Sequence, residues 1–285
     1  MAVKGNYIIR NMTAEEVEKV AVEWAAKEGW NPGLHDAPVF FTTDPSGFFI
    51  GLLDDEPVAC MSAVAYNSDF GFIGFYIVKP EYRKAGYSIK LVNAAINHLK
   101  TQNIGLDGVV EQQQNYRKIG FKMAYNNIRF EGETGKNDVK FPGIVDVSEV
   151  DFEKIAAYDI NLFPVSRSHF LKGWLTLPDS NAFASILDKT LTGYGVIRKC
   201  RQGYKIGPLF ADTIEIARQI LLSLLDSVES DMRFYIDIPE VNKQALELTM
   251  EFNMIKVFET ARMYSKSFPA IELGKVFGIT SFELG

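Results

Sequence analysis

A loop between an apolar strand and an amphipathic helix carries residue types that bind phosphate. The run 72–78 (Phe-Ile-Gly-Phe-Tyr-Ile-Val) predicts a buried strand, which Pro80 ends because proline has no N–H to donate. From Ser88 onward, apolar residues recur at helical spacing. The N-terminus of that helix offers unsatisfied N–H groups and a partial positive charge. Gly86 lets the backbone approach a ligand and Arg83 adds a fixed cation, so the loop predicts a pyrophosphate site.

The loop does not match two common phosphate motifs. A Walker A loop needs a second glycine followed by Lys-Ser/Thr, and neither this nor Gly-x-Gly-x-x-Gly occurs here. Arg83-x-x-Gly86-x-Ser88 instead resembles the acetyl-coenzyme A loop of the GNAT acetyltransferase superfamily, Arg/Gln-x-x-Gly-x-Gly/Ala. Ser88 departs from the usual glycine or alanine, but it is small and we expect a modest effect. The alternative is an ordinary strand-to-helix turn that needs a glycine.

A second motif follows further along the chain. Residues 115–121 (Asn-Tyr-Arg-Lys-Ile-Gly-Phe) resemble the GNAT signature in which a short helix ends in Tyr-x-x-x-Gly-Phe. Gly120 is then the left-handed residue that stops the helix. In GNAT enzymes this tyrosine often lies near the coenzyme A sulfur, which implies that Tyr116 protonates the leaving thiolate. The alternative for Tyr116 is an aromatic side chain packed at a helix end.

The two motifs together imply an acyl donor, acetyl-coenzyme A, and no metal. On the same resemblance, the donor-binding residues are Ile77, Val78, Arg83, Lys84, Ala85, Gly86, Tyr87, Ser88 and Asn115. Backbone N–H groups at the end of strand 72–78 are expected to polarise the thioester carbonyl. A carboxylate must take the amine proton, and the candidates are Glu111, Asp107 and Asp36. The alternative for each is a solvated or structural carboxylate.

The segment 24–36 is expected to border the acceptor cleft, because the corresponding loop does so in GNAT enzymes. Its mix of aromatic and polar side chains suits a small-molecule pocket. The candidate acceptor-binding residues are therefore Trp30, Asn31, His35 and Asp36. The alternative is an ordinary loop anchored by buried tryptophans.

The composition limits the classes of partner. A net charge of -6 argues against general attraction to nucleic acid or anionic membranes and suits an amine substrate. Cys60 and Cys200 form no disulfide framework, and the 3 scattered histidines show no metal-ligand spacing. The first residues do not begin a signal peptide, and no apolar run reaches membrane length. We therefore expect a cytoplasmic monomer or homodimer that binds a small-molecule amine and neither nucleic acid nor membrane.

With 285 residues, the chain is long enough for two domains. The elements expected in 7–130 follow the order strand, helix, hairpin, strand, helix, strand, helix, strand. That is the GNAT arrangement, a mixed and mostly antiparallel sheet with helices on both faces. The polar stretch 131–138 is the expected domain boundary. The predicted fold is therefore α/β, with two tandem GNAT-type units: residues 1–133, which bind the donor, and residues 140–285.

The second half repeats the spacing of the first with altered chemistry. Residues 120–130 (Gly-Phe-x3-Tyr-x3-Arg-Phe) correspond to residues 253–263 (Asn-Met-x3-Phe-x3-Arg-Met). No Arg-x-x-Gly-x-Gly precedes the helix after Asp212, whose carboxylate would repel a phosphate. Thr249 stands where the first half has Tyr116. We therefore expect one active site, in the first unit; the alternative is that the repeat reflects a generic αβ pattern.

The whole pattern resembles a tandem-GNAT branch that includes holothin acetyltransferase-like proteins. The resemblance rests on the strings at 71–78, 110–116, 204–212 and 258–264. It implies an N-acetyltransferase that transfers an acyl group from coenzyme A to the amine of a small molecule by direct attack. The alternative is a non-catalytic protein that binds acetyl-coenzyme A or a metabolite as a sensor.

Overall fold

The computed structural model describes residues 5–99, 102–137 and 139–285. Residues 1–4, where we expect no signal peptide, and Asp138, the last residue of the expected domain boundary, lie outside this part. Within it, the strands form one continuous sheet in the order β1-β2-β3-β4-β5-β12-β6-β11-β10-β9-β8-β7, and β13 pairs with β10.

The first unit supplies five consecutive strands at one end of the sheet: β1 (Tyr7–Asn11), β2 (Phe48–Leu53), β3 (Glu56–Ala65), β4 (Phe70–Val78) and β5 (Asn103–Val109). Only β4 and β5 are parallel, and α4 (Tyr87–His98) forms the crossover between them. The other helices are α1 (Ala14–Glu16), the π-helix η1 (Val17–Val22), α2 (Glu23–Lys27), α3 (Asp36–Thr43), the 3₁₀ turns η2 (Pro80–Tyr82) and η3 (Val110–Gln112), and α5 (Gln113–Lys118).

The second unit repeats this plan at the other end: β7 (Ile144–Asp146), β8 (Ser180–Leu187), β9 (Thr190–Lys199), β10 (Tyr204–Ala211) and β11 (Arg233–Pro239). Here β10 and β11 are the parallel pair, and α8 (Ile214–Asp226) connects them. The remaining helices are the 3₁₀ turn η4 (Val147–Glu149), α6 (Phe152–Asp159), α7 (Ser168–Trp174), α9 (Lys243–Glu251) and the 3₁₀ turn η5 (Leu273–Lys275). The expected mixed α/β fold is therefore confirmed, including its two similar units.

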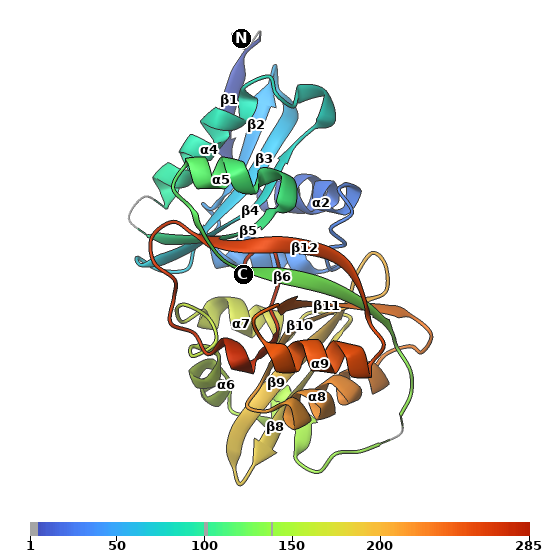
Figure 1. Cartoon of the computed structure of the whole chain (residues 1–285). Coiled ribbons are helices and arrows are strands. Elements are labelled where there is room, and N and C mark those ends of the chain that lie inside the picture. The colour runs from blue at the N-terminus through green and yellow to red at the C-terminus, as the bar shows by residue number, and fades with distance from the viewer. Residues whose placement is uncertain (1–4, 100–101, 138) are drawn as a thin grey trace.

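The two units exchange their last strands. β12 (Ile255–Tyr264), from the second unit, lies between β5 and β6 (Lys122–Glu133), and β6, from the first unit, lies between β12 and β11. Figure 1 shows the green β6 and the orange-red β12 crossing the middle of the molecule, between the blue first unit and the yellow-orange second unit. The exchange joins the two sheets into one.

One buried ion pair links each exchanged strand to its host strand. Arg262 on β12 donates to both oxygens of Asp107 on β5, at 3.0 and 2.8 Å. Arg129 on β6 makes the equivalent pair with Asp237 on β11, at 2.7 and 2.8 Å. Each aspartate is the fifth residue of its strand, so the pairs occupy equivalent places in the two units.

The apolar core also crosses the seam between the units. Phe40 on α3 packs edge-on against Phe75 on β4, at 5.7 Å between ring centroids, and stacks at 5.8 Å on Trp174 from α7 of the second unit. All three side chains are at most 1% exposed. Dense packing of this kind leaves little freedom for one unit to move against the other.

The last residues of the chain run along the second unit and then reach the first. β13 (Val276–Gly278) pairs antiparallel with β10, and the N–H of Ile279 donates to the carbonyl of Asp237 on β11, at 2.8 Å. The segment thus lies between β10 and β11, which pair only from Tyr204 to Ile206 on the β10 side. Residues 280–285 then continue to β4, where the Glu283 carbonyl lies against Gly74, and the hydroxyl of Tyr66 in the β3–β4 turn donates to the carbonyl of Leu284 at 2.9 Å.

Candidate active site

The predicted phosphate loop forms an open helix N-terminus. Gly86 is the N-cap of α4 with φ 90°, a left-handed conformation that glycine adopts without strain. Lys84 before it also has a positive φ, of 66°. No described side chain caps α4, so the first N–H groups of this helix are available to an anion.

A groove of about 640 Å³ runs from this helix end toward α5. Six of the nine predicted donor-binding residues line it: Ile77, Val78, Arg83, Lys84, Ser88 and Asn115. Ala85 and Gly86 lie in the loop itself, outside the lining. Tyr87 is buried, with its ring 5.0 Å from that of Tyr7, and therefore supports the loop from behind.

The side chain of Arg83 lines the groove and is held in place by two hydrogen bonds. Its Nε donates to the carbonyl of Val78 at 2.9 Å, and Nη2 donates to Glu28 at 2.5 Å. The side chain lines the groove and remains 46% exposed, and its charge is paired with Glu28.

β4 separates from β5 beside the groove. The two strands pair only from Phe70 to Ile73 on the β4 side. Phe75, two residues later, has a φ of 47°, which is rare for a bulky side chain, and the β3–β4 register shifts at the same place. Within the described residues, the edge of β4 beyond Ile73 has no neighbouring strand on that side. Its backbone N–H groups are thus available to a ligand carbonyl.

The groove leads to an inner pocket with a cavity volume of about 50 Å³. Trp30, Tyr76, Val109, Gln112 and Phe258 line both spaces, so the two are continuous. The inner pocket lies against β4, β5 and β12. Its small volume admits a few non-hydrogen atoms, enough for the reacting end of an acceptor.

Tyr116 lies on the wall of the inner pocket. Its ring packs on β5 at Gly108, where an added Cβ would be 3.0 Å from the ring, and lies 6.1 Å from the ring of Phe121. Burial raises the pKa of the Tyr116 phenol above its usual value of 10.0. The phenol therefore keeps its proton at neutral pH and can act as a donor.

The three predicted carboxylates have different environments. Glu111 is exposed and lines the outer groove. Asp107 lines the inner pocket, but Arg262 and the amide of Asn127 (2.8 Å) already occupy its oxygens. Asp36 is 1% exposed, pairs with Arg198 at 3.0 Å and accepts from the N–H of Gly33 at 2.8 Å, away from both spaces.

Of the predicted acceptor loop, only Trp30 lines the pocket. The Asn31 side chain bonds to both backbone groups of Gln202, and His35 contacts Asp179 at 2.9 Å. Asp36 pairs with Arg198, so all three of these side chains are bound to the second unit. The structure therefore does not bring Asn31, His35 and Asp36 to the pocket lining.

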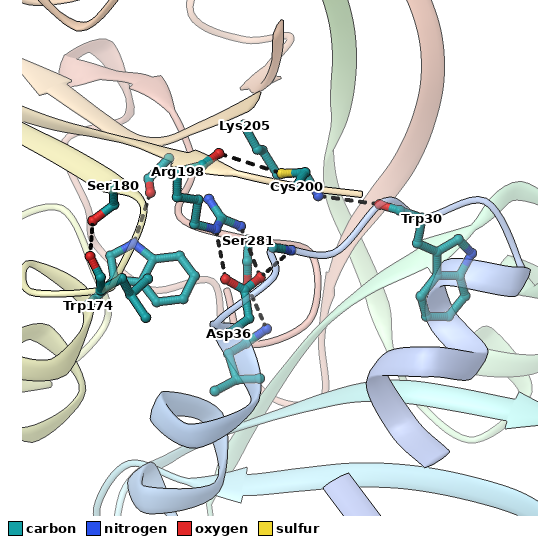
Figure 2. A network of polar contacts seen from close by, with 12 residues as sticks. Trp30, Asp36, Trp174, Ser180, Arg198, Cys200, Lys205 and Ser281 are labelled. Atoms are coloured by element: carbon teal, nitrogen blue, oxygen red, sulfur yellow. Dashed lines mark hydrogen bonds and ion pairs between the residues drawn. The ribbon is translucent and has the colours of Figure 1, made fainter. Parts of the chain in front are cut away.

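The carbonyl of Trp30 holds two buried cations. Arg129 donates to it at 2.8 Å and the Nζ of Lys205 at 3.3 Å. Figure 2 shows Lys205 directed at Trp30, and Arg198 directed at Asp36 nearby. These contacts hold the Trp30 backbone between the units, at the place where its side chain faces the groove.

Four residues of the pocket come from the second half of the chain, and the sequence alone does not reveal them: Phe258, Thr260, Phe282 and Glu283. Phe258 and Thr260 reach the site on the exchanged strand β12, and Phe282 and Glu283 on the segment after β13. Tyr76 and Gln112 are also new, although both adjoin the motifs. No local sequence signal marks the four distant residues, because their position depends on the strand exchange.

In the second unit, the segment that begins with β13 fills the position that corresponds to the groove of the first unit. β13 occupies the gap between β10 and β11. Asp212, just before α8, accepts from the hydroxyl of Tyr158 at 3.0 Å and pairs with Lys275 at 3.2 Å. Thr249 is buried and donates to the carbonyl of Leu246 at 2.8 Å.

Across 5–99, 102–137 and 139–285, no group of three or more His, Cys, Asp or Glu side chains is placed to hold a metal ion. No helix of the same residues is long and apolar enough to cross a membrane.

Comparison with known families agrees with this architecture. A model of the acetyltransferase (GNAT) family matches residues 12–121, and a model of an acetyltransferase (GNAT) domain matches residues 155–278. The chain belongs to the GNAT acetyltransferase family, with two such domains in tandem, and is an acyltransferase.

Particular relatives extend the match over the whole chain. It is 30% identical over 267 residues to the holothin acyltransferase of Pseudoalteromonas sp. (strain SANK 73390), covering 94% of this chain and 91% of the relative. It is 28% identical over 219 residues to an uncharacterized N-acetyltransferase of Bacillus subtilis, covering 75% and 76%.

Solved structures share the fold. A Pyrococcus horikoshii protein superposes with a TM-score of 0.84 at 24% identity, over 100% of this chain and 98% of the other. A tandem GNAT protein from the clavulanic acid biosynthesis pathway superposes with a TM-score of 0.64 at 10% identity, over 93% and 99%. The tandem-GNAT resemblance seen in the sequence is thus confirmed.

Proposed function

We propose that the protein transfers an acetyl group from acetyl-coenzyme A to the amine of a small molecule, in the first unit. The observation that carries the proposal is the uncapped N-terminus of α4 beside the split between β4 and β5. The pyrophosphate would accept from the first N–H groups of α4, and Arg83, Lys84 and Ser88 would surround it. The pantetheine arm would follow the free edge of β4.

Tyr116 is the proposed acid. The thioester supplies an activated carbonyl, which the free N–H groups of β4 would polarise. The amine attacks directly, since neither described cysteine is accessible: Cys60 and Cys200 are at most 3% exposed. Tyr116 then donates its proton to the departing sulfur at the inner end of the groove.

The small inner pocket favours a small-molecule acceptor. We assign donor binding to the unit 1–133 and a supporting role to 140–285, whose own gap holds β13. A cytoplasmic location and a monomeric or homodimeric state remain part of this proposal, as does the lack of nucleic-acid and membrane partners, which the net charge of -6 supports.

Donor binding is tested by thermal unfolding with acetyl-coenzyme A. Ligand at a hundredfold excess over its Kd should add about 2.7 kcal/mol to the free energy of unfolding. Gly86→Asn and Gly86→Asp both tolerate a positive φ and differ mainly by one charge at the phosphate. The Asp variant should lose the shift and the Asn variant should retain part of it. A wild-type protein without a shift would refute the donor assignment.

Turnover separates the enzyme from a non-catalytic sensor of acetyl-coenzyme A. The free thiol released with an amine substrate measures the rate. Tyr116→Phe should lower kcat by about 10²- to 10⁴-fold and leave the thermal shift with acetyl-coenzyme A unchanged, because the ring still packs on Gly108. An unchanged kcat would remove Tyr116 as the acid.

A further inference from the structure

Glu283 lines the inner pocket, and its buried carboxylate has no hydrogen-bond partner among the described residues. The residue is 2% exposed, and both Oε1 and Oε2 lack such a partner. A buried carboxylate without hydrogen bonds costs several kcal/mol, so natural proteins rarely keep one without a function. The geometry leaves both oxygens available to a ligand.

The backbone holds Glu283 firmly at this place. Its carbonyl oxygen lies against Gly74 on β4, where an added Cβ would be only 2.1 Å from it. The N–H of Leu284 donates to Ser281 Oγ at 3.0 Å, and the N–H of Gly285 donates to the Ser281 carbonyl at 3.1 Å. These two bonds close a turn that contains Glu283. Glu283 is therefore part of the packed structure, beside the point where β4 separates from β5.

Three buried cations, Arg129, Arg198 and Lys205, act on the Glu283 carboxylate through their charge, but among the described residues none donates a hydrogen bond to it. Arg129 already pairs with Asp237, and Arg198 with Asp36 (Figure 2). Lys205 bonds to the Trp30 carbonyl and forms no ion pair within the described residues, and burial lowers the pKa of its ammonium. Apart from Glu283, the titratable groups around the site are Tyr76, Asp107, Tyr116, Arg129, Arg198, Cys200, Lys205 and Asp237.

A second polar atom faces the same space. The hydroxyl of Thr260 on β12 is buried and has no partner in the part of the chain that the structure describes. The rest of the lining is mainly aromatic, with Trp30, Phe75, Phe258 and Phe282. A primary ammonium group on a flat apolar body would satisfy the carboxylate and hydroxyl together and contact the rings.

We propose that Glu283 is the residue that binds the ammonium group of the acceptor and removes its proton, and that the acceptor is a primary amine on a compact apolar or aromatic group. This assignment rests on the acyltransferase function proposed above. It makes Glu283 a catalytic residue that the second unit supplies to the active site of the first. Asp107, whose oxygens are occupied, and Glu111, which is exposed, do not have this position.

The proton steps balance as follows. Glu283 takes one proton from R–NH₃⁺, and the freed lone pair of the nitrogen forms the C–N bond with the acyl carbon. The electron pair of the C–S bond leaves with sulfur. The nitrogen gives up a second proton as the amide forms, sulfur gains one from Tyr116, and the nitrogen proton restores the phenol. The net reaction releases one proton, and this is the proton that Glu283 took from the ammonium group and then gives to water.

The test uses 2-phenylethylamine as the probe and 2-phenylethanol as its uncharged analogue. With coenzyme A bound, the wild-type protein should bind the amine about tenfold or more tighter than the alcohol in calorimetry. Glu283→Gln should abolish this preference and lower kcat/KM for acetyl transfer to the amine by about 10²- to 10³-fold. Glu259→Gln is the matched control, because Glu259 also lies on the second unit's strand β12 but its side chain is 37% exposed and pairs with Lys256.

Each result decides between the two proposals. No thermal shift of the wild-type protein with acetyl-coenzyme A refutes the acyltransferase proposal itself. A normal shift with equal binding of amine and alcohol refutes only the role of Glu283. If Glu283→Gln loses the coenzyme A shift as well, the carboxylate is a structural counterion and the inference is wrong. Should that variant fail to fold, Glu283→Asp, which keeps the charge, and the wild-type preference for the amine decide instead.

Discussion

Breaking the buried ion pair that joins an exchanged strand to its host strand should strongly destabilise the whole chain. In Arg262→Met, the Asp107 carboxylate loses its two charge-assisted hydrogen bonds and stays buried, since the two side chains are 4% and 0% exposed. Removing one partner of such a pair costs about 3–5 kcal/mol. Arg262 also lies 5.0 Å over the ring of Phe72, a contact that methionine only partly replaces.

Typical domains have a free energy of unfolding of about 5–15 kcal/mol, so a loss of 3–5 kcal/mol is a large share and lowers the folded-to-unfolded ratio by roughly 10²- to 4 × 10³-fold. Urea unfolding followed by circular dichroism would record it as a lower midpoint at an unchanged slope. A second substitution, Asp107→Asn, should recover most of the loss in the double variant, because the unpaired charge is gone.

A surface pair with the same geometry provides the control. Arg218 donates twice to Glu251, both at 2.8 Å, but the side chains are 33% and 42% exposed. Arg218→Met should therefore cost at most about 1 kcal/mol. If Arg262→Met and Arg218→Met are equally mild, the seam is not a dry interior, and the argument that the exchanged strands are held by buried charge is wrong.

Two further predictions concern the same region. Burial would raise the pKa of the Asp237 carboxyl, but Arg129 beside it holds that pKa below the usual 3.8. Stability from this pair is therefore fully present above about pH 4 and is lost as pH falls through the lower folded value; Asp237→Asn should flatten that acid-side slope in urea midpoints. Gly74→Ala should cost about 1–3 kcal/mol and expose the last residues to carboxypeptidase, because the new Cβ meets the Glu283 carbonyl. Gly274→Ala, with open space around it, should do neither; equal behaviour of the two would contradict the close contact.

Local sequence patterns predict the backbone geometry of the proposed donor loop, because its residues are contiguous. The residues from Arg83 to Ser88 lie between one strand and the next helix, and the positive φ of Gly86 follows from the residue type. Tyr116 precedes Gly120, and φ values of 99° there and 51° at Asn253 match the expected helix stops in both halves. The roles of these residues in catalysis and binding remain proposals.

The acceptor side depends on contacts between distant parts of the chain. Asp36 in a polar loop looks like a substrate ligand, but its partner is Arg198, which is 162 positions away. The strand exchange likewise has no local signal, since β6 and β12 each read as the last strand of its own unit. A pattern read one unit at a time therefore cannot place Thr260 or Glu283 beside Tyr116.

The closed gap of the second unit and the inner pocket of the first have a common origin. The segment that begins with β13 pairs with β10 and so occupies the space that a donor would need in the second unit. Only because it lies there can the next residues reach β4 and place Phe282 and Glu283 at the pocket. If the second gap bound a donor instead, this segment would have to leave, and the first site would lose part of its wall. The single active site that we propose for the tandem chain would thus be a consequence of the path of this segment, as well as of the missing glycine loop before Asp212.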